Sequence, residues 1–347
     1  MKTRSKIATL LSCAALCGTI NASAQADIHF SQFYETSILR NPSLTGIFTN
    51  DYKVGGYYRN QWSSISSPYV TSLGYAEVRF SVGHVSDDYV SFGFLGYTDK
   101  AGTLDQKISS FYPAINYSKS LNPDKNTYLS VGFTGGYTQY SFDKSKITVD
   151  NQYVGGSFNA NNPTYENIIN VKMSMWDLGA GINLNSSTGN DNNITYIVGI
   201  SAYHLTKPKF SYFDIPGVTQ NMRLNLNGAI GFNVKENIVT QVHTNLALQG
   251  SYVESMTGVL TTYSEPGGGA HPAYALTGGL FYRFADAIIP VVKLKYKNAS
   301  IGASYDVNIS KLRQASKLRG GYELTLSLSG DWSDKSGILK KTVCPQF

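Results

Sequence analysis

The histidines and paired glycines that could support chemistry are scattered along this chain of 347 residues. The five histidines fall on different predicted strands and turns, without the spacing of metal ligands: His29, His84, His204, His243 and His271. Glycine pairs beginning at Gly55, Gly135 and Gly278 lie within predicted strands, which indicates packing or curvature and not a phosphate loop. No residue stands out as a nucleophile, although a hydrolase could still bring Ser and His together in space. The sequence therefore predicts no enzyme, no cofactor and no metal site.

The elements that would position polar side chains are strands, and the segment 222–234 shows them best. Met222, Leu224, Leu226, Ile230, Phe232 and Val234 form one row, opposite Arg223, Asn225, Asn227 and Asn233. This period of two is that of a β-strand. One apolar face and one face too polar for a core fit a strand between lipid and water. The same phase recurs in 274–284, 288–296, 299–308 and 320–330.

Charged residues decide which row points inward. A Lys or Arg facing lipid at mid-bilayer costs roughly 2 to 4 kcal/mol, so we expect the charged row to face the lumen. That row contains Glu77, Arg79, Arg223, Arg283, Lys293, Lys295, Asp306 and Glu323. Opposite charges in a narrow interior would pair. We therefore expect a structural ion-pair network that closes the lumen; a conducting or selective pore is the alternative.

Strand number and length predict the fold class. The candidate strands are 52–60, 69–80, 89–98, 107–118, 127–140, 173–184, 194–205, 222–234, 238–248, 251–263, 274–284, 288–296, 299–308 and 320–330. Many are long enough to cross an outer membrane at a tilt, whereas soluble strands usually have about five or six residues. We predict an all-β fold, a transmembrane antiparallel β-barrel of about 14 strands. An exported β-sandwich, which also alternates polar and apolar residues, is the alternative.

Connection lengths predict the orientation of this barrel. The longest connections, 141–172, 206–219 and 309–319, follow odd-numbered strands. Bacterial barrels keep short turns in the periplasm and place longer loops outside. With the N-terminus in the periplasm, these three loops lie outside. The connection 264–273 is long for the periplasmic side and is the exception.

The N-terminus predicts export. Basic residues within 1–6, an apolar run over 7–20 and the small residues 22–24 form a signal peptide, cleaved between Ala24 and Gln25. An uncleaved membrane anchor is the alternative. Cys344 is then the remaining cysteine, so no internal disulfide can form. No later stretch is apolar enough for a transmembrane helix, which leaves a closed barrel as the way to span a membrane.

Charge excludes one class of partner. Removal of the leader takes away Lys2, Arg4 and Lys6, and lowers the formal charge from +6 to +3. This excess is too mild to indicate nucleic acid binding.

Four stretches carry a resemblance to a known family. They are 29–34 with 41–46, then 58–62, then 305–310 with 312–313 and 319–324, and finally 344–347. Together, and in this order, they resemble the PorP/SprF family, outer-membrane proteins associated with the type IX secretion system of Bacteroidetes. The chain departs from the family pattern at Ser43, Gln314 and Gln346, where Ala, Pro and Arg are common.

The resemblance implies a function that the strand pattern does not reveal. It implies an integral outer-membrane barrel that helps to secrete and anchor substrates with a type B C-terminal domain, such as gliding adhesins. Its partners would be those secreted proteins, other type IX secretion components and outer-membrane lipid. Four parts are expected: a signal peptide (1–24), a periplasmic or plug segment (25–50), the barrel (51–331) and a periplasmic tail (332–347).

The pair Asn41-Pro42 supports a rival function. It breaks any helix that begins upstream. A similar Asn-Pro element lies in the N-terminal plug of FadL-type transporters, so a FadL-like transporter of hydrophobic small molecules is the alternative. From the sequence, 25–50 is equally well a plug or an ordered lead-in to the first strand.

Two predicted outer loops are candidate partner-binding surfaces. Loop 141–172, with Tyr153 and Asn159, has a mixture of Tyr, Gly and Asn that suits adaptable contacts. Loop 309–319 carries Lys311, Arg313, Lys317 and Arg319. These basic residues could meet an acidic domain or anionic lipopolysaccharide. The alternative is that both loops are merely solvated.

Overall fold

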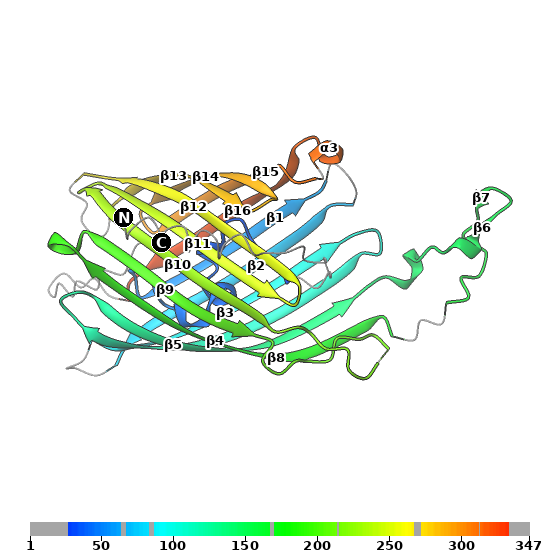
Figure 1. The fold of residues 1–347 in the computed structure, drawn as a ribbon, viewed down its shortest axis with the longest axis horizontal. Helices are drawn as coiled ribbons and strands as arrows, with labels where there is room; N and C mark the ends of the chain where they lie inside the picture. Colours follow the sequence, from blue (N-terminus) through cyan, green and yellow to red (C-terminus); the bar gives the residue numbers. More distant parts are fainter. Residues whose placement is uncertain are drawn as a thin grey trace, which may run out of the picture.

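Fourteen strands close into one antiparallel barrel in the part of the chain that the computed structural model describes (Figure 1). That part is residues 27–332 without 64–66, 83–86, 167–169, 214, 267–271 and 312. The all-β transmembrane barrel predicted from the alternating rows is confirmed. The predicted cleavage between Ala24 and Gln25, and the tail beyond Trp332, lie outside the described residues and stay predictions.

The barrel strands lie close to their predicted bounds. They are β1 (Tyr52–Gln61), β2 (Tyr69–Ser81), β3 (Tyr89–Ala101), β4 (Gln106–Asn122), β5 (Thr127–Ser141), β8 (Lys172–Thr188), β9 (Ile194–Tyr203), β10 (Arg223–Lys235), β11 (Ile238–Gln249), β12 (Tyr252–Ser264), β13 (Tyr274–Arg283), β14 (Ala287–Tyr296), β15 (Ala299–Asn308) and β16 (Arg319–Gly330). Each strand pairs with its neighbours along the chain, and β1 pairs with β16 from Tyr52 opposite Gly330 to Gln61 opposite Gly321. This seam leaves no unpaired sheet edge in the wall.

Alternation along each strand separates lumen from lipid. In β10, Asn225 and Asn227 are buried in the interior, whereas Leu226 and Ile230 are exposed on the outer wall. In β16, Leu324 and Leu326 are exposed and Glu323 is buried. Since the outer wall is the apolar one, the barrel is turned inside out relative to a soluble protein, as a lipid environment requires.

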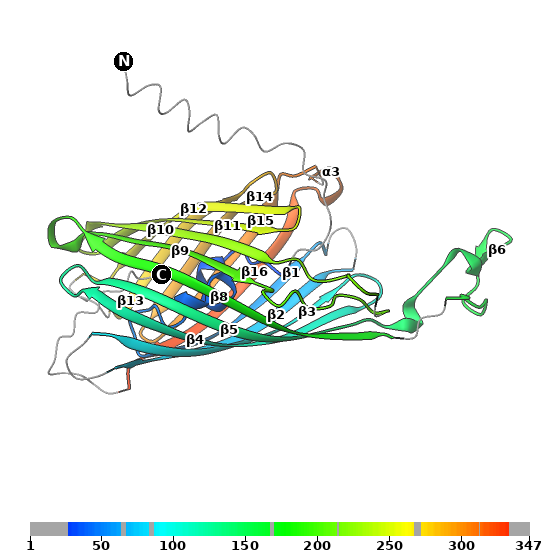
Figure 2. The ribbon, with the colours of Figure 1, turned by 60° about the horizontal axis from the view of Figure 1, so that its bottom comes forward.

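The connections make the two ends of the barrel different. Long connections at 142–171, 204–222 and 309–318 share one end, which we call the outer end. Short turns at 123–126, 236–237 and 297–298 share the other, which we call the periplasmic end. The β5–β8 connection holds the two-stranded hairpin of β6 (Tyr153–Val154) and β7 (Ser157–Phe158), which projects beyond the barrel wall (Figure 2).

The described helices are short. They are η1 (Phe33–Glu35), α2 (Ser37–Arg40), η2 (Pro42–Leu44), η3 (Lys144–Lys146), η4 (Asp150–Gln152), η5 (Asn190–Asn192) and α3 (Arg313–Ser316). Within the described residues, no helix has the length and apolar character needed to cross a membrane. The first three belong to residues 27–50, which are drawn in blue inside the barrel in Figures 1 and 2.

Plugged lumen and candidate partner-binding surface

Residues 27–50 run through the lumen from the outer end to the periplasmic end; we call them the plug. At the outer end, Asp27 contacts His204 and Gln249, which follow or end strands there. At the periplasmic end, the backbone N–H of Asp51 donates to the carbonyl of Gly330 on β16. The described part of the segment therefore lies inside the barrel, not beneath it.

A cluster of buried charges holds the plug to the seam of the barrel. Glu323 on β16 accepts hydrogen bonds from the backbone N–H groups of Ser31 (2.7 Å) and Gln32 (2.9 Å). The hydroxyl of Ser31 donates to Asp306 on β15 (2.6 Å), and Arg283 lies 3.0 Å from the same carboxylate. Arg59 on β1 lies 3.1 Å from Glu323. Each of these carboxylates thus has cationic and neutral donors, which is what a buried charge needs.

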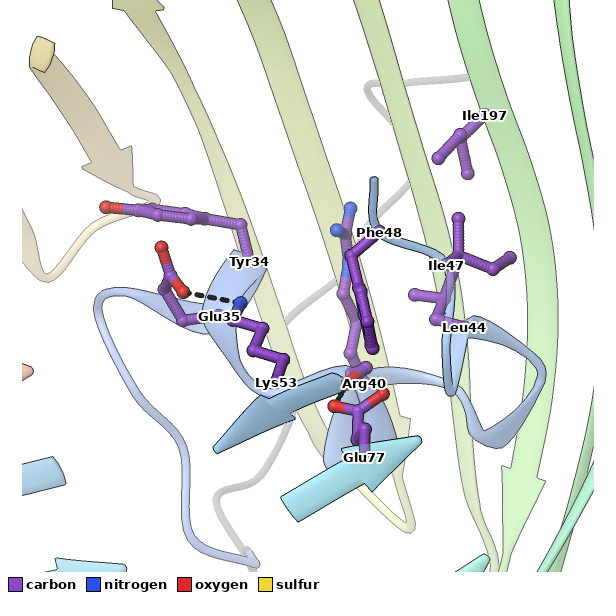
Figure 3. Close-up of a pocket in the computed structure, with 10 residues that line it drawn as sticks. Tyr34, Glu35, Arg40, Leu44, Ile47, Phe48, Lys53, Glu77 and Ile197 are labelled. Carbon is purple, nitrogen blue, oxygen red and sulfur yellow. Dashed lines mark hydrogen bonds and ion pairs between the residues drawn. The ribbon is translucent and has the colours of Figure 1, made fainter. Parts of the chain in front are cut away.

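Glu35 of the plug bridges β1 and β14. Figure 3 shows it beside Lys53 of β1. Its carboxylate contacts the ammonium groups of Lys53 on β1 (2.8 Å) and Lys293 on β14. Burial alone would raise the pKa of Glu35, but these two cations outweigh burial and lower it to about 2. One plug side chain therefore serves as the shared counterion of two lysines from different strands.

The Asn41-Pro42 turn fits against glycines of the wall. The Asn41 side chain accepts from the backbone N–H of Ser43 (3.0 Å), so it caps η2, and its amide donates to Asn227 on β10 (2.9 Å). A Cβ added to Gly132 on β5 would lie 2.4 Å from the Pro42 carbonyl group, and one on Gly181 would lie 1.9 Å from the Asn41 side-chain oxygen. The plug reaches this depth because those wall positions have no side chain.

The part of the plug near the periplasmic end is hydrogen-bonded to β2. Glu77 accepts from the backbone N–H of Gly46 (2.7 Å) and from the hydroxyl of Ser37. Arg79 donates to the carbonyls of Phe48 (2.7 Å) and Thr49 (3.0 Å). Two neighbouring lumen-facing charges thus bind the plug backbone instead of pairing with each other.

The space left beside the plug is small. A cavity of about 40 Å³ lies between Tyr34, Arg40 and Glu77 (Figure 3), room for very few water molecules. The guanidinium of Arg40 donates to the carbonyls of Gly228 and Thr244 and lies over the Phe33 ring. Burial lowers the pKa of Arg40 to about 9. The lumen at this level is packed, not an open channel.

Among the described residues, His204 is the one histidine with a carboxylate beside each ring nitrogen. Its Nε2 lies 2.7 Å from Asp27 and its Nδ1 lies 2.9 Å from Asp177. Burial would lower the pKa of His204, but Asp27 and Asp177 together raise it to about 9. Because both nitrogens are engaged, neither is available to activate a nucleophile, and the group acts as a latch between plug and wall.

Some of the predicted lumen charges pair with the plug and others pair with each other. Arg223 lies 3.5 Å from Asp27, Lys293 contacts Glu35, and Arg283 contacts Asp306 directly. Lys295 is near Lys293, on the same face of β14. Among the described residues, no group of three His, Cys, Asp or Glu side chains could hold a metal ion.

Sequence reasoning missed several members of this network. Arg59 and Lys53 alternate with outward-facing residues on β1, so the same phase rule could have placed them in the lumen. Asp177 and Glu254 are also inward positions, on β8 and β12. No such signal exists for Asp27 or Glu35, which lie outside any alternating strand.

The candidate partner-binding residues lie at the outer end. Tyr153 on β6 is 63% exposed. The Asn159 side chain accepts from the backbone N–H of Asn161 (3.0 Å), so it shapes the loop. The four basic residues of 309–319 are all exposed, around α3 and the start of β16: Lys311, Arg313, Lys317 and Arg319. Figure 1 shows α3 and the β6–β7 hairpin at the same end.

Several solved structures are similar to this chain. The TodX ΔS2S3 mutant, a monoaromatic hydrocarbon channel, has a TM-score of 0.49 and 9% identity, over 84% of this chain and 92% of that one. A Pseudomonas aeruginosa FadL homologue has a TM-score of 0.48 and 10% identity, over 85% and 95%. BamA from Haemophilus ducreyi lacking POTRA domains 1–3 has a TM-score of 0.40 and 8% identity, over 81% and 70%.

The fold assignment itself rests on the closed strand ladder of this chain. No curated protein matches the sequence of this chain. A family model does match, described as type IX secretion system membrane protein PorP/SprF, and it covers residues 22–328, which is well over half of the chain. With its alternating wall and its outer-membrane architecture, the chain belongs to the PorP/SprF family of type IX secretion system membrane proteins.

Proposed function

We propose that this protein is a non-enzymatic outer-membrane barrel that binds a type IX secretion substrate at the cell surface and so assists its secretion and anchoring. The bound substrate carries a type B C-terminal domain, as gliding adhesins do. Family membership supports the secretion context. The observation that carries the binding role is a set of exposed apolar side chains on the β5–β8 loop, away from the lipid-facing wall.

Exposed apolar side chains are unfavourable in a loop that contacts only water. Val154 is 62% exposed, Phe158 48% and Tyr165 82%. Large apolar side chains that stay exposed on a loop away from lipid are typical of a protein-binding site, and Tyr and Phe are enriched at the centres of interfaces. The hairpin also stands clear of the wall (Figure 2), so a folded domain could reach it without displacing lipid.

The basic loop adds a charge preference. Arg313 and Lys317 are exposed beside α3 at the same end as the hairpin. Positive charge at the rim of an interface mainly steers association and orients the partner. We therefore assign the apolar hairpin to affinity and this loop to the approach of an acidic surface on the partner.

The rival function, transport of hydrophobic small molecules as in FadL-type proteins, needs an apolar passage. The described interior combines buried polar side chains such as Asn183 and Glu323 with apolar ones that pack against the plug, such as Phe281 with Phe33 (5.5 Å between ring centroids). The cavity beside the plug is only about 40 Å³. These observations favour binding at the surface. Fatty acid retained on detergent extraction, together with unchanged surface adhesin after gene deletion, would favour transport.

The test is capture by the full-length tagged barrel in its native host. Wild type is expected to co-purify with one secreted protein. Capture of that protein is expected to fall at least tenfold in the hairpin variant Tyr153→Ser/Val154→Ser/Phe158→Ser. The matched control is Phe213→Ser/Ile215→Ser, which removes comparably exposed apolar residues (56% and 52%) from the β9–β10 connection. Equal capture by the triple variant and wild type would overturn the assignment of the hairpin.

A further inference from the structure

On the outer wall of β2, β3, β4, β5 and β8, polar, basic and aromatic residues form successive rows that the rest of the described barrel wall does not repeat. Cross-strand registers put one outward residue of each strand side by side. One such row reads Ser72, Thr98, Ser109, Gln139 and Ser174, each directly opposite the next. The corresponding outward positions on β10 to β16 are mostly apolar, for example Leu248, Val253 and Ile288. A hydroxyl and amide row on a lipid-facing wall needs an explanation.

The row one pleat nearer the outer end is basic. Lys100, Lys107, Ser141 and Lys172 are opposite one another on β3, β4, β5 and β8. Lys146 reaches the same edge, since it contacts Asp105, which also pairs with Lys100 at 2.9 Å. Asp143 is nearby through its backbone hydrogen bond to Leu104. Four lysines thus meet two aspartates, and positive charge is in excess.

The row one pleat nearer the membrane centre is hollow at one side and aromatic at the other. It reads Gly74, Gly96, Phe111, Tyr137 and Trp176. The Tyr137 and Trp176 rings are 4.9 Å apart, and Trp176 is 75% exposed. An open hollow of about 400 Å³ is bounded by Ser72, Gly96, Thr98, Ser109, Phe111 and Gln139.

The height of these rows matches the boundary between hydrocarbon and headgroups. On β4 the outward lysines Lys107 and Lys119 are twelve positions apart, with Phe111, Pro113, Ile115 and Tyr117 between them. Twelve residues of tilted strand rise roughly 30 Å, about the thickness of the hydrocarbon core. Lys119 then marks the inner boundary and Lys107 the outer one. Aromatic side chains such as Trp176 also favour this interface.

We propose that this wall is a binding site for a phosphorylated glycolipid of the outer leaflet, of the lipid A type. The lysine row takes the phosphate groups, because ammonium groups bind phosphate as point charges. The hydroxyl and amide row hydrogen-bonds the sugar ring, and the hollow at Gly96 takes the first part of an acyl chain beside Phe111. An ordinary glycerophospholipid would leave the sugar-facing row without its partner.

The experiment uses the purified full-length barrel in detergent and measures the dissociation constant of three probes by native mass spectrometry. The probes are lipid A with both phosphates, dephosphorylated lipid A and phosphatidylglycerol. Wild type is expected to bind lipid A at least tenfold more tightly than either other probe. Lys100→Gln/Lys107→Gln/Lys172→Gln is expected to lose that preference. Electrophoresis checks that each variant is folded, because a folded barrel migrates faster in an unheated sample than after heating.

Two further variants separate charge from shape. Gly96→Leu fills the hollow, and the backbone there can accept a side chain because an added Cβ would be no closer than 3.6 Å to Ser110. It is expected to weaken lipid A binding without touching a lysine. Lys207→Gln/Lys209→Gln removes two exposed outer-end lysines of the β9–β10 connection and is expected to bind like wild type. Equal lipid A affinity in the wall triple variant, or equal affinity of wild type for phosphatidylglycerol, would overturn the proposal.

Discussion

Arg59 and Glu323 face each other across the seam of the barrel, with the Arg59 Nε 3.1 Å from a Glu323 carboxylate oxygen. Their side chains are only 4% and 1% exposed. Glu323 also accepts the backbone N–H groups of Ser31 and Gln32. One carboxylate therefore joins the first strand, the last strand and the plug, so closure of the wall and seating of the plug are coupled.

Removing this charge should destabilise the barrel. Glu323→Gln keeps the shape of the side chain but leaves Arg59 without its full countercharge, and breaking one side of a buried ion pair costs roughly 3 to 5 kcal/mol. We expect a matching loss in the free energy of unfolding, measured by urea titration in lipid vesicles. Glu236→Gln, at an exposed periplasmic turn, is the control and should behave as wild type. A loss below about 1 kcal/mol would show that Glu323 does not couple seam and plug.

The alternating rows predicted the wall because a strand exposes its side chains alternately to two solvents of opposite polarity. Asp306 and Glu323 were assigned to the lumen on that rule, and it extends without change to Arg59. It could not reach Asp27 or Glu35. Their positions depend on contacts such as Pro42 against Gly132, which join residues far apart in the chain and leave no local period in the sequence.

The Gly132 position offers a direct test of how the plug is seated. Gly132→Leu would bring a side chain into the Pro42 backbone, only 2.4 Å from an added Cβ. We expect the plug to be displaced and ion conductance to appear in planar bilayers, where wild type should be nearly silent. Gly135→Leu is the matched control on the same strand, because that position faces outward and an added Cβ meets Leu178 at 3.9 Å. A silent, fully stable Gly132→Leu barrel would contradict this arrangement.

Because of the latch formed by His204, the free energy of unfolding should fall as the pH becomes alkaline. The pKa of this histidine is raised from an ordinary 6.5 to about 9 by Asp27 and Asp177, against the effect of burial. A raised folded-state pKa means that the stabilisation is complete below pH 6.5 and is lost as pH rises through 9. The shift corresponds to about 3 kcal/mol. Between pH 6 and pH 10, the free energy of unfolding should therefore fall by about 3 kcal/mol more in wild type than in His204→Gln. Parallel pH curves for the two proteins would rule out the latch.

Glu35 should produce the opposite dependence at acid pH. Its pKa is lowered from 4.5 to about 2 by Lys293 and Lys53, which outweigh burial. Its contribution is therefore complete above pH 4.5 and is lost as pH falls through 2, again about 3 kcal/mol. Glu35→Gln should be less stable than wild type at pH 7, and the two should converge near pH 2 in urea titrations.

The control for the Glu35 experiment is Glu166→Gln, a substitution in the exposed β5–β8 loop. It should have the same stability as wild type at pH 7 and at pH 2, because this exposed side chain lies outside the plug and its ion pairs. Lys293→Met should show the same acid convergence as Glu35→Gln if the ion pair is the cause, since it removes the cation that lowers the pKa most. A Lys293→Met barrel with the full acid dependence of wild type would instead place the effect in Lys53, the other cation that contacts Glu35.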